Sequence, residues 1–299
     1  RPERVELAAF ERAYHGDTLG AVSLGGIPVF RGVGERTGYP VRRLGGLEDL
    51  AGLDPARLAA VVIEPLIQGA AGMRLWPKGM LRALADWCRE QDVFLILDEV
   101  MTGFGRTGTM FACQQEGVVP DFIALAKGLT GGYLPLAATL TTERVFDGFL
   151  GRPEEGRTFF YGHSYTANAL GCAAALGSLR VFREEKVLDG LPAKIARLSA
   201  ELRQFEALPW VAGTRQCGLI AGIDLVTEKQ PHTPYPRERF MGAAVCAAAR
   251  RHGLLTRPVL DTLVLMPPLA ATEEEITRMA QALRAAVEEV CAVSPPASP

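Results

Sequence analysis

The stretch that decides the fold is Val93-Phe94-Leu95-Ile96-Leu97-Asp98-Glu99, five apolar residues followed by two acids. An unbroken apolar run of this length is typical of a strand buried on both faces, as in a parallel sheet. Two further runs have the same form. Residues 59–63 end at Glu64-Pro65, and residues 122–126 end at Lys127-Gly128. The three runs predict neighbouring buried strands.

Helical patterns lie between and after these strands. Met80, Leu84, Trp87 and Cys88 have the spacing of one helix face, so the order strand, helix, strand predicts an α/β fold with a mainly parallel sheet flanked by helices. The last third differs. It predicts a helix near 185–205, short strands near 218–225 and 263–266, and a helix opened by a capping box at Thr272. We therefore predict a large domain at 1–184, a smaller α+β domain at 185–293 and a disordered tail at 294–299.

Composition excludes several classes of protein. The 299 residues carry 32 basic and 34 acidic side chains, a net charge of −2, which disfavours binding to nucleic acid or an anionic membrane. No apolar run approaches the roughly 18 residues that span a bilayer. The six cysteines form no Cys-x-x-Cys pair, so we expect no metal site and a reducing compartment, the cytoplasm.

Each predicted strand ends in a charged residue, namely Glu64, Asp98 or Lys127. Ligands of open parallel sheets bind at the carboxyl ends of strands, so a shared site is expected there. Lys127 lies between small residues and is expected to be partly desolvated, which favours the nucleophilic neutral amine. A Schiff-base cofactor needs such an amine and a carboxylate beside its ring nitrogen. The two residues alone leave a plain Asp98–Lys127 ion pair equally open.

One motif points elsewhere. Residues 103–108, Gly-Phe-Gly-Arg-Thr-Gly, fit the Gly-x-Gly-x-x-Gly pattern of dinucleotide-binding folds. Two acids precede these glycines, however, and would lie near a pyrophosphate. No long helix is predicted after Gly108, so we disfavour a nicotinamide enzyme.

Longer motifs resemble the class III pyridoxal-phosphate (PLP) aminotransferases. They are Tyr14-His15-Gly16-Asp17-Thr18, Glu64-Pro65, Leu97–Val100, residues 102–108 and Ala126-Lys127-Gly128, and the resemblance runs from about Tyr14 to Leu283. It implies a fold-type I architecture. Residues 129–142, Arg257-Pro258 and residues 265–268 resemble the branch that makes 7,8-diaminopelargonate in biotin biosynthesis. Met101 stands where ornithine-type relatives carry Gln, which argues against that branch.

The resemblance implies a role for each site residue. Lys127 would form the Schiff base with PLP and move the proton, and Asp98 would pair with the pyridine nitrogen. Tyr14 and Val100 would cover the two ring faces, Ser164 would bind the phosphate of the neighbouring subunit in a homodimer, and Arg257 would bind a substrate carboxylate. Tyr14 and Gly162 would also line the substrate site, and Glu64 would support it from behind. His15 and His163 are expected to be hydrogen-bonded packing residues.

The implied reaction is PLP-dependent transamination of 7-keto-8-aminopelargonate (8-amino-7-oxononanoate), with S-adenosylmethionine as amino donor. Lysine as donor, another ω-amino acid substrate, and a non-catalytic remnant acting as a folded interaction domain stay open. The chain begins at Arg1 and lacks the Gly-Ser-rich phosphate turn that precedes the Tyr-His-Gly motif in this family. We therefore expect an N-terminal segment to be missing from this numbering.

Overall fold

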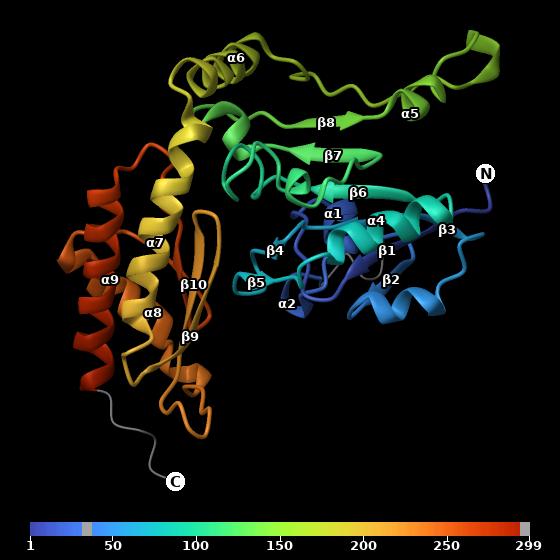
Figure 1. Cartoon of the computed structure of the whole chain (residues 1–299). Coiled ribbons are helices and arrows are strands. Elements are labelled where there is room, and N and C mark those ends of the chain that lie inside the picture. Colours follow the sequence, from blue (N-terminus) through green and yellow to red (C-terminus); the bar gives the residue numbers. More distant parts are fainter. Residues whose placement is uncertain (32–37, 294–299) are drawn as a thin grey trace. The chain divides into compact units, whose positions relative to one another are not determined.

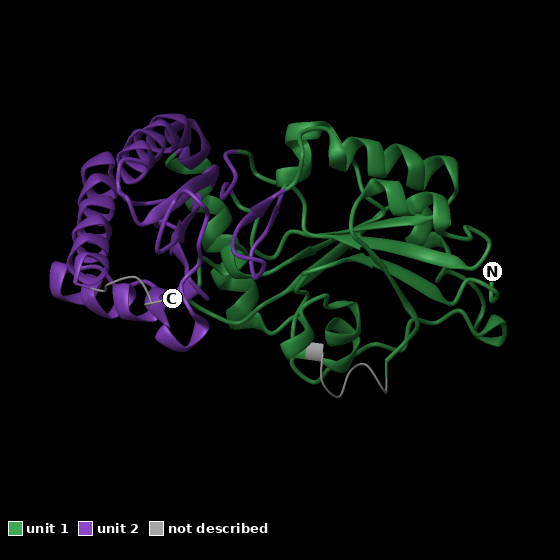
Figure 2. Ribbon diagram, turned by 90° about the horizontal axis from the view of Figure 1, so that it is seen from below, with its two compact units in different colours: residues 1–66, 76–104, 109–185 green, residues 67–75, 105–108, 186–299 purple. Residues whose placement is uncertain are grey.

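The computed structural model describes residues 1–31 and 38–293 (Figure 1). It divides the chain into two compact units (Figure 2). Unit 1 holds residues 1–66, 76–104 and 109–185, and unit 2 holds residues 67–75, 105–108 and 186–299. The chain leaves unit 1 for the last time after Glu185, next to the predicted boundary. Segments 67–75 and 105–108, which the sequence assigns to the large domain, group with unit 2. The predicted tail at 294–299 lies outside the described residues.

A six-stranded sheet forms the centre of unit 1, in the order β2-β1-β3-β6-β7-β8. The first five strands in this order run parallel, and β8 pairs antiparallel with β7 at one edge. The strands are β1 (Glu6–Phe10), β2 (Val41–Leu44), β3 (Leu58–Ile63), β6 (Phe94–Asp98), β7 (Phe122–Leu125) and β8 (Ala138–Thr141). The three predicted strands are β3, β6 and β7, so the prediction of a mainly parallel sheet is confirmed. The predicted burial on both faces holds for β3, but β6 buries alternate residues and β7 buries only Leu125 of its four residues.

The helices of unit 1 pack on this sheet and extend from it. Helix α4 (Met80–Glu90) buries Met80, Leu84 and Cys88 against β3 and β6, as their spacing predicts. Helices α1 (Leu19–Leu24), α2 (Pro28–Arg31) and α5 (Glu143–Asp147) are short. After α5 the chain runs out in an extended arm and returns to α6 (Ala169–Glu184), a helix that the sequence reading missed (Figure 1).

Unit 2 places three helices on a four-stranded antiparallel sheet of order β11-β12-β10-β9. The helices are α7 (Leu191–Phe205), α8 (Met241–Ala249) and α9 (Glu273–Ala292), and the strands are β9 (Val211–Cys217), β10 (Ile220–Leu225), β11 (Pro258–Val259) and β12 (Thr262–Leu265). Thr272 and Glu275 form the predicted capping box of α9. The segment 67–75 adds the small hairpin β4 (Ile67–Gln68) and β5 (Arg74–Leu75).

The described residues also form seven 3-10 helices: η1 (Leu47–Gly52), η2 (Ala112–Glu116), η3 (Lys127–Thr130), η4 (Pro153–Glu155), η5 (Val187–Gly190), η6 (Arg237–Arg239) and η7 (Arg250–His252). Among residues 1–31 and 38–293, no helix is long and apolar enough to cross a membrane. The same residues contain no group of three or more His, Cys, Asp or Glu side chains that could hold a metal ion.

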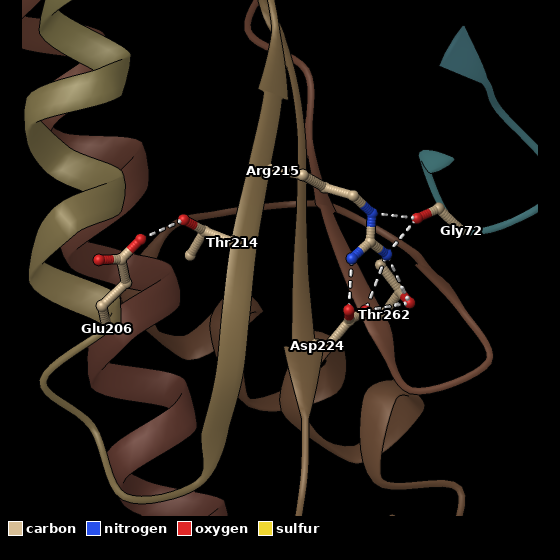
Figure 3. A network of polar contacts seen from close by, with 6 residues as sticks. All are labelled: Gly72, Glu206, Thr214, Arg215, Asp224 and Thr262. Carbon is tan, nitrogen blue, oxygen red and sulfur yellow. Dashed lines mark hydrogen bonds and ion pairs between the residues drawn. The ribbon is translucent and has the colours of Figure 1, made fainter. Parts of the chain in front are cut away.

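Arg215 of β9 ties the hairpin segment to the sheet of unit 2 (Figure 3). Its Nε donates to the Gly72 carbonyl at 2.8 Å, and its terminal nitrogens bind both carboxylate oxygens of Asp224. Thr262 donates to the same carboxylate at 2.7 Å. Gly72 has φ +82, and a Cβ there would lie 3.0 Å from Thr262 Oγ1, so only glycine suits this contact.

These contacts make unit 2 sensitive to acid. Burial would raise the pKa of Asp224, but the hydrogen bonds from Arg215 and Thr262 outweigh burial and lower the pKa. A carboxylate with a lowered folded-state pKa stabilises the fold above its unfolded-state pKa, and this contribution is lost as pH falls through the folded-state pKa.

We expect Arg215→Met to lower the free energy of unfolding by about 1–3 kcal/mol at pH 7, because it removes charge-assisted hydrogen bonds. The loss should be smaller at an acidic pH below the lowered pKa of Asp224, where this carboxylate is protonated. Urea denaturation followed by circular dichroism at both pH values measures this, with exposed Arg237→Met as the matched control. An equal loss in the two variants, or a loss that does not change with pH, would contradict the assignment.

Candidate functional site

The three charged residues that follow the central strands lie on one edge of the sheet. Ile63 of β3 pairs with Leu97 of β6, so Glu64 and Asp98 leave adjacent strands at the same level. Asp98 in turn pairs with Ala124 of β7, and Lys127 follows three residues later. The predicted shared edge is therefore present, with acids on two strands and an amine on the third.

Asp98 is held by two hydrogen bonds from different parts of the chain. Its Oδ1 accepts the Val100 backbone N–H at 3.1 Å, and its Oδ2 lies 2.8 Å from His15 Nδ1. The Asp98 side chain keeps 14% of its surface exposed, whereas that of His15 keeps 4%. An ionised carboxylate offers about four acceptor positions. The carboxylate is therefore fixed in orientation and still has acceptor capacity for a ligand.

Lys127 is exposed, so the prediction that its surroundings partly desolvate it is wrong. Lys127 opens η3, and this turn directs Leu129 and Thr130 inward and leaves the lysine outside. Among the described residues Lys127 makes no ion pair with Asp98, whose partner is His15, so the simple ion-pair interpretation also fails.

The backbone around Lys127 is unusual. Lys127 has φ +42, a left-handed conformation that costs energy in a residue with a side chain. A Cβ at Gly128 would lie 2.8 Å from the Cβ of Phe104, so only glycine allows the chain to approach Phe104 here. Strained residues of this kind cluster at functional sites, where the surrounding structure holds them.

The loop after β1 reaches this edge. The Tyr14 backbone N–H donates to Glu64 Oε2 at 3.4 Å, and the Glu64 carbonyl accepts from Trp76 Nε1 at 3.0 Å. The Tyr14 ring packs edge-on against Phe30, with ring centroids 5.6 Å apart. Strand β3 lies between β1 and β6, so the loop crosses the end of β3 to bring His15 to Asp98. Glu64 is buried and supports Tyr14 through the backbone.

Glu99, next to Asp98, has a structural task that the sequence did not reveal. Its fully buried carboxylate accepts from Thr102 Oγ1 at 3.1 Å and from the Ala112 and Cys113 amides at 2.6 and 2.9 Å. These bonds fix the turn that follows Asp98. Burial, with the Glu99 charge nearby, raises the pKa of Cys113 to about 12, so its thiol stays protonated.

The remaining candidates lie in different places. Val100 and Met101 follow Asp98 in the turn and are half-buried. Gly162 and Ser164 are exposed in the arm between α5 and α6. Arg257 is exposed and precedes β11 of unit 2. The segment after Gly108 leads only to η2, so no long helix opens there and the dinucleotide interpretation is not supported.

A partly buried carboxylate at the end of one strand, and a strained lysine just after the neighbouring strand, form an arrangement that suits a Schiff-base cofactor. The family model for aminotransferase class-III matches residues 1–287. The chain belongs to the class-III aminotransferase family. The family assignment made from the motifs is therefore confirmed, and members of this family depend on PLP.

Two curated relatives that match most of the chain have the same name. The chain is 49% identical to adenosylmethionine-8-amino-7-oxononanoate aminotransferase of Nitratidesulfovibrio vulgaris, over 95% of this chain and 56% of that protein. It is 43% identical to the protein of the same name from Geobacter sulfurreducens, over 97% of this chain and 69% of the relative. The chain thus spans just over half to about two thirds of the length of these relatives.

Solved structures agree with the predicted fold-type I architecture. The Methanocaldococcus jannaschii adenosylmethionine-8-amino-7-oxononanoate aminotransferase superposes with a TM-score of 0.93 at 39% identity, covering 96% of this chain and 69% of that chain. An ω-transaminase of Pseudomonas jessenii in complex with PMP superposes with a TM-score of 0.90 at 27% identity, covering 99% of this chain and 71% of that chain. The predicted fold class is confirmed.

Proposed function

We propose that the whole protein transfers an amino group to 7-keto-8-aminopelargonate, giving 7,8-diaminopelargonate for biotin biosynthesis, with S-adenosylmethionine as donor. The observation that carries the proposal is the Asp98 carboxylate, held by His15 and Val100, on the strand next to Lys127. The shared name of the relatives, at up to 49% identity, supports this substrate pair.

The residues present fit PLP. When bound, PLP withdraws electrons from the substrate carbon that loses its proton. Asp98 would hold a positive ring nitrogen by charge and hydrogen bonding, since its carboxylate keeps acceptor capacity. Tyr14 and Val100 would pack on the two ring faces. Lys127 Nζ would hold the cofactor covalently until the substrate amine displaces it, and the freed amine would then carry the proton from the substrate carbon to the cofactor.

The residues proposed to bind the substrate do not belong to the carboxyl edge of the unit 1 sheet. Arg257 would bind the carboxylate of the keto acid through two parallel hydrogen bonds from its guanidinium. Gly162, with no side chain, would leave room beside Tyr14. Lysine as donor, or another ω-amino acid as substrate, is the alternative. Met101 disfavours the ornithine-type branch, because a thioether gives only weak hydrogen bonds.

The homodimer is part of the proposal. The arm between α5 and α6 exposes Phe159, Phe160, Tyr161 and Tyr165, with 63–89% of each residue accessible. Three aromatic rings of the arm pack on one another, with ring centroids 5.0 Å apart for Phe149 and Phe159 and 5.6 Å apart for Phe159 and Tyr161. Exposed aromatic patches of this kind mark interfaces. Ser164 lies in the same arm, so a second copy docked there would receive it at a phosphate site.

A cytoplasmic location completes the proposal. All six cysteines are free thiols, and four of them are buried, which suits a reducing compartment.

The donor assay tests the reaction. Purified whole protein with PLP and 7-keto-8-aminopelargonate should give 7,8-diaminopelargonate with S-adenosylmethionine and far less with lysine, as measured by mass spectrometry. If 7,8-diaminopelargonate forms with lysine and not with S-adenosylmethionine, lysine is the amino donor. A protein that binds PLP but converts neither pair would contradict the substrate proposal, and one that does not bind PLP would favour the non-catalytic remnant.

Lys127→Ala should abolish turnover, a loss of several orders of magnitude, because no other amine replaces the nucleophile. Borohydride reduction followed by intact-mass measurement should attach PLP to the wild-type chain and not to the variant. Lys78→Ala, an exposed lysine before α4, is the matched control and should behave as wild type. Retained activity in Lys127→Ala would refute the Schiff-base assignment.

Phe160→Asp should weaken the dimer at least about tenfold, because it places a charge in a desolvated aromatic contact. Sedimentation velocity over a concentration series measures the dissociation constant. Val119→Asp is the control, since Val119 is 87% exposed on another part of unit 1. If Phe160→Asp and Val119→Asp both sediment as wild type, the arm is not the interface.

A further inference from the structure

We propose that His15 is a positioning residue for Asp98: its neutral imidazole, protonated on Nδ1, orients the carboxylate toward the cofactor nitrogen. This inference rests on the proposed function for the cofactor, but the His15–Asp98 pair itself is a property of the chain alone.

The first support is the way the carboxylate is held. Oδ1 is fixed by the Val100 amide, which belongs to the turn directly after Asp98. Oδ2 is fixed by His15, 83 residues earlier in the chain, at 2.8 Å from Nδ1. Without His15, the Val100 bond would leave the carboxylate free to rotate about its one remaining contact. The histidine therefore determines where the free lone pairs of Asp98 point.

The second support is the burial of the ring. His15 keeps 4% of its side chain exposed, and its Nε2 is buried with no hydrogen-bond partner among the described residues. A charged imidazolium would bury an unpaired N–H donor at Nε2, which is costly. A neutral ring with its proton on Nδ1 avoids that cost and donates to Asp98.

The third support is the anchoring of the loop that carries His15. The preceding residue, Tyr14, is tied by its amide to Glu64, and the Ala13 carbonyl accepts from the Gly26 amide at 2.7 Å. Gly16 follows with φ +122, a conformation that other residues rarely adopt. The backbone on both sides of His15 is therefore constrained, and the ring is not free to leave Asp98.

The first test needs no cofactor and no change at His15. His163, His232 and His252 are exposed, so a variant with Gln at all three leaves His15 as the single histidine of these 299 residues, and comparison with the spectrum of the same variant carrying His15→Asn assigns its signals. Nitrogen-15 NMR of this labelled protein without PLP should show a neutral ring with the proton on Nδ1. A ring protonated on Nε2, or on both nitrogens at neutral pH, would overturn the proposal.

The second test compares two substitutions. The side-chain nitrogen of Asn is as many bonds from Cα as His Nδ1, so His15→Asn can keep the donor, whereas His15→Leu keeps bulk and loses it. We expect His15→Leu to weaken PLP binding about tenfold or more, measured by fluorescence titration, and to lower kcat with the acceptor KM unchanged. His15→Asn should recover most of both.

A purely structural role would give a different pattern. Both variants would then lose thermal stability together while PLP affinity and kcat per folded molecule stayed at wild-type values, and this result would overturn the proposal. Failure of the proposed function is seen separately, as wild-type protein that does not bind PLP or convert the keto acid, whatever the NMR of His15 shows.

Discussion

The parallel pairing of β3, β6 and β7 is the constraint on which the site depends. Ile63 pairs with Leu97, and Asp98 pairs with Ala124, so the three carboxyl ends form one edge. Central strands of a parallel sheet are apolar and tolerate few charges within their length. The first charged residues therefore come where each strand ends, and the register places two acids and a lysine on the same edge of the sheet.

The two adjacent acids at the end of β6 have separate tasks because of their surroundings. Glu99 is fully buried and satisfied by three donors, so its charge serves to hold the turn. Asp98 has two donors and stays partly exposed. A buried carboxylate without enough donors would be costly, and one with all its acceptor positions filled could not bind a ligand. Asp98 has enough donors to be stable where it is partly buried, and it keeps free acceptor positions for a ligand.

The sequence predicts best the elements whose packing follows a regular pattern. Apolar runs predict strands β3, β6 and β7, and helical spacing predicts α4 and α9. Strand β2 has no apolar run, since two adjacent arginines, Arg42 and Arg43, occupy its centre at a sheet edge. Helix α6 has no clear apolar face, since its Leu170 and Leu176 are exposed. The assignment of segment 67–75 to unit 2 depends on Arg215, 143 residues from Gly72, and no local pattern reveals such a contact. The prediction that Lys127 is desolvated was wrong because local sequence does not show which side of η3 faces inward.

His15 shows what the sequence motif leaves out. The Tyr-His-Gly motif marks the residue, but its partner lies across the end of β3 and is known only from the sheet order. The choice of histidine also has a physical reason. An arginine or lysine at this position would neutralise Asp98 and compete with a positive ring nitrogen for the same carboxylate. A neutral imidazole donates a hydrogen bond and leaves the negative charge intact. Orientation and charge can then be supplied by different groups, His15 for the first and Asp98 for the second.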